Sequence, residues 1–138
     1  MADKFLTTTI SGKRKKAVAK LRFKQGSGNI VYNHLLYTEL PLFHKLALAE
    51  PLRIYEQEIG DALKYDLVIK TIGGGKEAQI QAARLAIAKA LIQLTGSDTL
   101  QKTYIAYDRN MVVPDSRRKE ARKHGDSKAR ARRQKSYR

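Results

Sequence analysis

The chain has 138 residues, a formal net charge of +15 and no cysteine. This length predicts a single domain, and the lack of cysteine excludes disulfides and thiolate metal sites. We expect a soluble, cytoplasmic protein, because no apolar run approaches the ~20 residues that span a bilayer. The N-terminal residues also lack the apolar stretch of a signal peptide.

The positive charge is concentrated at the two ends of the chain. Residues 1–30 contain eight Lys or Arg and one acid, residues 31–113 contain nine of each, and residues 114–138 contain eleven Lys or Arg and three acids. Such self-repulsion brings no advantage to a protein without a partner, so the pattern predicts a polyanionic partner. We expect a globular domain over residues 1–113 and an extended basic tail over residues 114–138.

The first predicted element is a strand over residues 17–24, where small or large apolar residues alternate with mostly basic ones. This period of two indicates one buried face and one basic face. The glycines within residues 25–29 predict a turn. Residues 29–33 predict a second short strand that completes a hairpin with the first.

The middle of the chain predicts two helical segments. Residues 41–49 indicate a short helix with Pro41 in its first turn. Glu50 and Pro51 interrupt this helix, and residues 52–63 indicate a second one.

A strand followed by a long helix is expected next. The β-branched residues within 65–72 predict a central strand. Residues 76–94 predict the longest helix, with an apolar stripe at helical spacing formed by Ile80, Ala83, Ile87, Leu91 and Leu94.

The last helix is predicted over residues 99–108, with Ser97 or Asp98 as its N-terminal cap. Gly96 is the expected C-terminal cap of the preceding helix. Residues 111–113 predict an edge strand before the tail begins.

Three glycines, Gly73 to Gly75, join the predicted central strand to the long helix. The Walker pattern requires a hydroxyl residue where Glu77 stands, and the dinucleotide-binding pattern also fails. We therefore interpret the glycines as a tight turn that lets the helix pack closely on the strand. A compatible interpretation is that their backbone approaches an RNA phosphate at the helix N-terminus.

No pattern in the sequence indicates catalysis. The three histidines, His34, His44 and His124, are scattered and form no pair at helical spacing, so we predict no metal site. No feature singles out a nucleophile with an activating base. We expect neither an enzyme nor a cofactor.

The basic residues near the N-terminus form a strip. Four consecutive basic residues, Lys13 to Lys16, are followed by Lys20, Arg22 and Lys24 on one predicted strand face. Together with the tail they predict nucleic-acid binding. RNA is favoured over DNA, because helix-turn-helix, zinc and zipper signatures are absent and arginine-rich extensions become ordered on folded RNA. A nuclear-localisation signal within the tail stays open as an additional role.

Several segments together resemble a known family. The run "GGGKEAQIQAARLAIAKAL", residues 73–91, is similar throughout to the signature of the universal small-subunit ribosomal protein nine family. The segments "GKRKKAVA", "AEPL", "YDRNMVVPDSRRKE" and "QKSYR" resemble the same family in the same order. The signature positions of most interest are Gly73, Gly74, Gly75, Gln79 and Lys89.

Two positions depart from the family pattern. Lys16 stands where Thr or Ser is usual, which adds charge to an RNA-facing loop, and Ala121 stands where some relatives have Pro. The C-terminal residues resemble archaeal and eukaryotic cytosolic members, and the short body suggests an archaeon or a reduced eukaryote.

The resemblance implies an α+β fold, in which a small mixed sheet packs against helices and contains a left-handed βαβ connection. It implies a place in the head of the small ribosomal subunit, next to other head proteins and on the 3′ major domain of the small-subunit rRNA. It also implies that the tail reaches the anticodon stem-loop of the tRNA in the peptidyl site. The predicted tRNA-contacting residues are Lys135, Tyr137 and Arg138.

The predicted rRNA-binding residues are all basic and lie in the strip, near residue 109 and in the tail. They are Lys13, Arg14, Lys15, Lys16, Lys20, Arg22, Lys24, Arg109, Arg117, Arg118, Lys119, Arg122, Lys123, Lys128, Arg130, Arg132 and Arg133. An RNA-binding protein that acts away from the ribosome, for example as a regulator or chaperone, stays open as the alternative.

Overall fold

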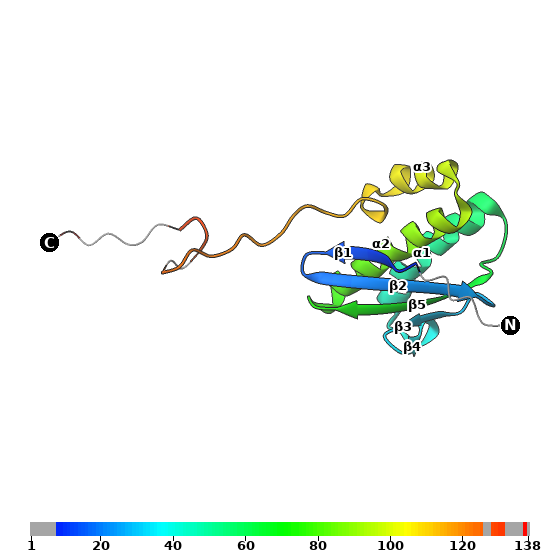
Figure 1. The fold of residues 1–138 in the computed structure, drawn as a ribbon, viewed down its shortest axis with the longest axis horizontal. Coiled ribbons are helices and arrows are strands. Elements are labelled where there is room, and N and C mark those ends of the chain that lie inside the picture. The colour runs from blue at the N-terminus through cyan, green and yellow to red at the C-terminus, as the bar shows by residue number, and fades with distance from the viewer. Residues whose placement is uncertain (1–7, 126–127, 132–136, 138) are drawn as a thin grey trace.

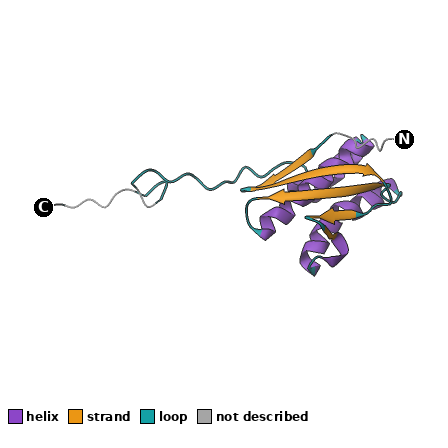
Figure 2. Ribbon diagram, turned by 60° about the horizontal axis from the view of Figure 1, so that its bottom comes forward, coloured by secondary structure: helices purple, strands orange, loops and turns teal. Residues whose placement is uncertain are grey.

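The computed structural model describes residues 8–125, 128–131 and 137. These residues form one mixed sheet with helices packed against one of its faces, as Figures 1 and 2 show. The strands are β1 (Ile10–Arg14), β2 (Ala17–Gln25), β3 (Ile30–Tyr32), β4 (Leu35–Leu36) and β5 (Tyr65–Ile72). The helices are α1 (Leu42–Ile59), α2 (Lys76–Thr95) and α3 (Asp98–Tyr107), with short 3-10 turns η1 (Tyr37–Glu39) and η2 (Arg109–Met111). The predicted α+β class is confirmed.

The strands predicted over residues 17–24 and 65–72 are confirmed as β2 and β5. They pair with each other in antiparallel register, with Leu21 opposite Ile69 and Lys20 opposite Lys70. The predicted alternation holds along β2, since Leu21 is buried against the helices while Lys20 and Arg22 are exposed. The central pair of the sheet thus follows directly from the period-two pattern.

The predicted hairpin between residues 17–24 and 29–33 is wrong. The sheet order is β1-β2-β5-β3-β4, so β5 lies between β2 and β3. The connecting loop wraps around Asp66 at the start of β5, whose Oδ1 accepts N–H bonds from Ser27, Gly28 and Asn29 at 3.0, 3.1 and 2.9 Å. Alternation along one segment reports which face is buried but not which strand is its neighbour.

A different hairpin, which the sequence analysis missed, forms at the N-terminus. Residues 10–14 form β1, which pairs antiparallel with β2 through a two-residue turn at Lys15 and Lys16. No element was predicted over these residues, because four consecutive cations hide the alternation of buried Ile10 and Gly12.

β3 and β5 are parallel neighbours, and the chain between them forms β4, η1 and α1. In Figure 1 the two strands point left with β5 above β3, and α1 passes behind the sheet. This sense of connection is left-handed, the uncommon hand for a βαβ unit, as the resemblance implied.

The predicted break at Glu50 and Pro51 is also wrong, because α1 continues through both residues as one helix. Pro51 is buried, and its carbonyl oxygen accepts a 2.6 Å hydrogen bond from the buried Tyr104 hydroxyl on α3. Burial raises the pKa of Tyr104, which keeps this donor protonated. Tertiary packing therefore offsets the cost of proline within a helix.

α2 is the centre of the core. The predicted stripe residues Ile80, Ala83, Ile87 and Leu91 are buried, and Leu94 is partly buried. The helix is buried around most of its circumference, because β1 and β2 pack on one side and α1 on the other. Small alanines between the larger side chains permit this close approach from several directions.

The end of the body differs from the prediction in one element. Ser97 caps α3, with its hydroxyl oxygen accepting the N–H of Leu100 at 3.4 Å, and Gly96 ends α2 in the left-handed conformation, as predicted. Residues 111–113 do not form an edge strand; Met111 ends η2 and is fully buried. Within the described part of residues 114–138 there is neither helix nor strand. Among the described residues, no helix has the length and apolarity to cross a bilayer.

Gly12 marks the closest approach of the sheet to α2, and its substitution tests the packing. A Cβ at this position would overlap the carbonyl oxygen of Ala82 and lie 2.8 Å from the amide nitrogen of Ala86. We expect Gly12→Ala to lower the free energy of unfolding by about 2–3 kcal/mol in urea titrations. Gly75→Ala is the control, because a Cβ there meets nothing within 4 Å, and its cost is expected to stay below about 1 kcal/mol. Equal losses in the two variants would contradict this account.

Candidate nucleic-acid interface

A cationic groove lies where three segments of the chain meet. These are the β1–β2 turn, the glycine loop before α2 and the residues that follow Pro114. The groove has a volume of about 770 Å³, and none of the described residues that line it is acidic. Its basic lining consists of Lys13, Lys15, Lys16, Arg117, Arg118 and Lys119.

The turn between β1 and β2 places two lysines in this groove. Lys15 adopts a left-handed backbone conformation, with φ of 52°. This conformation costs an ordinary L-residue about 1–2 kcal/mol, whereas glycine adopts it freely. Asn33 and His34 in the β3–β4 turn adopt the same kind of conformation, so this strain alone assigns Lys15 no role.

The glycine loop contacts the same turn from the other side. Gly73 and Gly74 have φ of 75° and 67°. A Cβ on Gly73 would lie 2.9 Å from the carbonyl oxygen of Lys16, and one on Gly74 would lie 2.9 Å from the amide nitrogen of Ala17. Gln79 holds the loop by donating from its side-chain amide to the Gly73 carbonyl at 2.9 Å. The predicted tight turn is confirmed, and its lack of side chains lets the basic turn approach.

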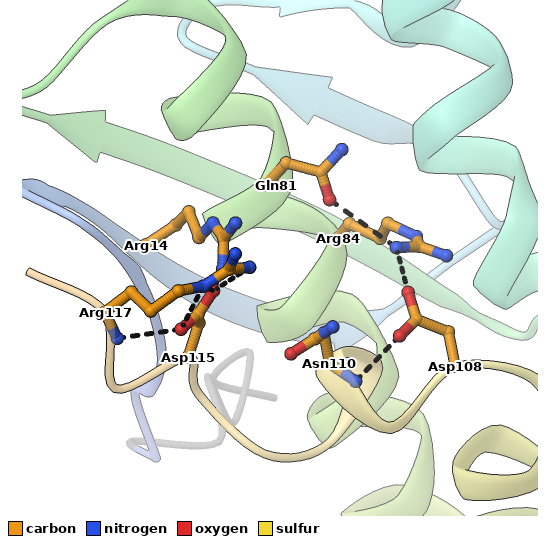
Figure 3. Close-up of polar contacts among 7 residues, drawn as sticks. All are labelled: Arg14, Gln81, Arg84, Asp108, Asn110, Asp115 and Arg117. Atoms are coloured by element: carbon orange, nitrogen blue, oxygen red, sulfur yellow. Dashed lines mark hydrogen bonds and ion pairs between the residues drawn. The ribbon is translucent and has the colours of Figure 1, made fainter.

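Asp115 fixes the third wall of the groove (Figure 3). Its side chain is only 8% exposed and forms ion pairs with Arg14 at the end of β1 and with Arg117. The distance to the Arg117 Nη2 is 2.8 Å, and Asp115 Oδ1 also accepts the backbone N–H of Arg117 at 2.8 Å. Arg14, predicted to bind RNA, is therefore engaged within the protein, where it attaches the start of the tail to the sheet.

A second ion-pair cluster, centred on Arg84, was missed by the sequence analysis. Arg84 on α2 is buried and pairs with Asp108 Oδ2 at 2.8 Å and with Glu50 Oε2 at 2.5 Å. Within the described part of the chain its Nε has no hydrogen-bond partner. Through Glu50 the cluster joins α2 to α1, and through Asp108 it joins α2 to the turn that precedes the tail (Figure 3). An arginine among the alanines and leucines of a buried helix was the only available signal.

The remaining predicted residues fall into separate groups. Three cations from the strip, Lys20, Arg22 and Lys24, lie exposed on the sheet face that carries no helix. Arg109 is exposed in η2, and Lys89 is half-buried on α2 and does not line the groove.

Beyond the groove the tail cations are exposed but not gathered into a site. These are Arg122, Lys123, Lys128 and Arg130. Arg130 donates to Glu120 at 3.0 Å. Tyr137 is 87% exposed. Four predicted residues lie outside the described part of the chain, namely Arg132, Arg133, Lys135 and Arg138.

The groove has the chemistry of a surface for anions. Its cations come from segments that are about 100 residues apart in sequence, and the amino end of α2 at Gly75 adds a favourable dipole. Cations on a shaped surface bind phosphate oxygens by charge-assisted hydrogen bonds. Among the described residues, no cluster of His, Cys, Asp and Glu is suited to hold a metal ion.

The fold and the groove together define an α+β protein with a cationic surface at the root of a basic C-terminal segment. Residues 12–138 match the family model described as ribosomal protein S9/S16. The chain is also 37% identical over 129 residues to the small ribosomal subunit protein uS9 of Methanothrix thermoacetophila, covering 93% of this chain and 96% of the relative. The chain therefore belongs to the S9 family of small-subunit ribosomal proteins, which are structural constituents of the ribosome and not enzymes.

The Arg84–Asp108 pair predicts how stability depends on pH. Burial by itself raises the pKa of Asp108, but hydrogen bonds from the Asn110 N–H and from Arg84 outweigh it, so the pKa is lowered overall. A lowered folded-state pKa stabilises the fold above the unfolded value of ~3.9, and this contribution is lost as the pH falls further. We expect wild type to exceed Asp108→Asn in free energy of unfolding at pH 7, and the difference to shrink below about pH 4. A constant difference from pH 7 to pH 2.5 in urea titrations would rule out this linkage.

Proposed function

We propose that this ribosomal protein binds the 3′ major domain of the small-subunit rRNA in the head of the subunit. The cationic groove carries this proposal, because it gathers six cations from two distant segments beside the glycine loop of a folded body. Phosphate contacts of this kind supply most of the affinity of a protein for structured RNA and fix its orientation. Other head proteins are its expected neighbours, and the ribosome of the cytoplasm is its expected location.

The assignment of residues to rRNA follows their position on the surface. The groove cations and the sheet-face cations contact the rRNA with the body, and Arg109 extends this surface. Arg122, Lys123, Lys128 and Arg130 neutralise phosphates along the tail, and we assign the same role to Arg132 and Arg133 from the family resemblance. Arg14 supports the groove from within, since Asp115 engages its guanidinium.

The tail is the part that we propose to reach the peptidyl-site tRNA. The resemblance covers the terminal "QKSYR", and the match to the family model extends to residue 138. Twenty-five extended residues reach at most ~80 Å, which suffices to pass from the groove through neighbouring RNA helices. Lys135, Tyr137 and Arg138 are the proposed contacts to the anticodon stem-loop, with Arg138 as the main phosphate ligand because its guanidinium offers five donors.

Lys15→Gly tests the groove without damage to the fold. Glycine fits the left-handed turn, so we expect the free energy of unfolding to stay the same or rise by up to about 1 kcal/mol. Loss of one phosphate contact is expected to weaken binding to a fragment of the 3′ major domain by roughly 3- to 10-fold. The slope of log K against log salt is expected to fall by about 0.7–0.9.

His34→Gly is the matched control for this variant. His34 is exposed, has φ of 72° in the β3–β4 turn, and does not line the groove. The control relieves the same kind of backbone strain and is expected to leave RNA affinity unchanged. Equal affinities for the two variants would remove the groove from the proposed interface.

Removal of Ser136 to Arg138 tests the tRNA contact separately. We expect subunit assembly to remain intact, because the groove and the rest of the tail persist, while the peptidyl-site tRNA dissociates faster and reading-frame errors increase. Tight-coupled ribosomes with the truncated chain would be compared with ribosomes carrying Arg130→Gln, which loses one tail charge upstream. Unchanged tRNA dissociation and frame maintenance in the truncated ribosome would exclude this role.

A further inference from the structure

The outer face of the sheet carries a second array of cations, in which Lys70 joins the strip residues Lys20, Arg22 and Lys24 that the sequence predicted. Helices cover only the inner face, and in Figures 1 and 2 the described residues leave the outer face of β1, β2 and β5 open. The register places Lys20 on β2 directly beside Lys70 on β5, with Ser11 of β1 on the other side. Lys70 was not among the predicted binding residues, because it stands alone in its segment.

This pair of lysines is unfavourable for the isolated protein. Like charges directly opposite each other on neighbouring strands destabilise a sheet. Both side chains are exposed, and their outward neighbours on the two strands are Val18, Arg22, Val68 and Ile72. None of these four is acidic. The nearest carboxylate in the outward row, Asp66, is opposite Lys24 at the end of the sheet. Its Oδ1 accepts the loop N–H groups and its Oδ2 lies 4.0 Å from the Lys24 Nζ, so it neutralises Lys24 in part but not the Lys20–Lys70 pair.

The outer face and the groove form one continuous surface. Lys13 and Val18 are register partners on the outer face, and both also line the groove. From this point the outward cations continue along β2 as Lys20, Arg22 and Lys24. A shallow concavity of about 340 Å³, lined by Arg22, Phe23, Lys24 and Val68, lies at the far end.

The geometry of this surface favours one kind of occupant. Outward side chains on a strand lie about 6.6–6.8 Å apart, which is close to the spacing of successive phosphates in an extended nucleic-acid strand. The outward residues of β1, β2 and β5 include no aromatic ring on which a base could stack. The partly exposed Val68 and Ile72, at 45% and 55%, offer aliphatic contact beside the cations. Such a surface suits the sugar–phosphate edge of RNA and not its bases.

We propose that the outer sheet face binds the sugar–phosphate backbone of a single RNA strand that runs along β2 and continues into the groove. This inference deepens the proposed rRNA binding and rests on it. Lys20 and Lys70 clamp one phosphate region from two strands, Arg22 and Lys24 follow along β2, and Val68 and Ile72 pack against ribose. A regular duplex is a poorer fit, because its convex surface meets a sheet over only a short arc.

The test compares two full-length double variants of equal net charge. Lys20→Gln/Lys70→Gln removes the paired lysines, and Arg53→Gln/Lys102→Gln removes two exposed cations from α1 and α3 in the helical layer. The probes are a single-stranded RNA of about 12 nucleotides and a blunt duplex of the same sequence, measured by fluorescence anisotropy over a range of salt. We expect the sheet variant to bind the single strand roughly 5- to 10-fold more weakly than the control, with a salt slope lower by about 1.4. Duplex binding is expected to differ little between the two variants.

Thermal unfolding is the second measurement. In it the variant that loses RNA affinity is expected to gain stability. Because the variant relieves a like-charge pair, we expect the melting temperature of Lys20→Gln/Lys70→Gln to rise by about 1–3 °C. A rise in stability together with a loss of affinity is the signature of a surface maintained for an anionic partner. A rise in stability with unchanged single-strand binding would overturn the proposal, and so would equal losses on strand and duplex.

Lys15→Gly separates failure of this inference from failure of the proposed function. If Lys15→Gly weakens RNA binding while Lys20→Gln/Lys70→Gln does not, RNA uses the groove alone and the sheet-face inference is wrong. If neither variant weakens binding, the proposed rRNA-binding surface fails with it.

Discussion

The cationic groove depends on the two ion pairs that the carboxylate of Asp115 forms. This carboxylate lies between two guanidinium groups, one from the sheet and one from the tail, and is almost fully buried by them. Without this negative charge, the basic N-terminal segment and the basic C-terminal segment would repel each other at close range. One carboxylate between Arg14 and Arg117 converts that repulsion into attraction and fixes the position of the residues that follow.

Two ion-pair clusters, one at Arg84 and one at Asp115, hold this part of the chain in place. The Arg84 cluster holds the end of α3 and η2 against the core, and Asp108 within it caps η2. The chain then reaches Asp115 within a few residues, so the second anchor acts on a segment that is already placed. Arg118 and Lys119 line the groove next to this anchor. A groove made from distant segments therefore has fixed walls in the free protein, which would reduce the ordering cost of binding a ligand there.

The sequence predicted those elements whose signal is local. β2, β5 and α2 were predicted nearly at their observed bounds, because alternation and helical periodicity report burial of each segment by itself. The order of strands was not predictable in this way, since the insertion of β5 between β2 and β3 depends on a loop that wraps around Asp66. The continuity of α1 through Pro51 likewise depends on a hydrogen bond from Tyr104, which is 53 residues away.

The candidate site was predictable in its charges but not in its pairings. Counting cations identified every basic residue of the groove, yet it treated Arg14 as free for RNA and gave Asp115 and Arg84 no role. Runs of like charge are visible in a sequence, whereas the carboxylates that neutralise some of them come from other segments. Lys70 is the reverse case, since it was not predicted as a binding residue although it lies on the cationic surface. A lone lysine becomes part of that surface only through its register with Lys20.

The exposed surface concentrates features that are unfavourable in the free protein. Lys15 occupies a turn that suits glycine, Lys20 and Lys70 lie side by side, and six cations share one groove. The buried, alanine-rich α2 and its contacts to both layers supply the stability that tolerates them. Any anionic ligand that binds only the folded state would relieve these repulsions and stabilise the protein by mass action. Under the proposed rRNA binding, folding and binding are thereby linked, and the protein is expected to be more stable in the complex than alone.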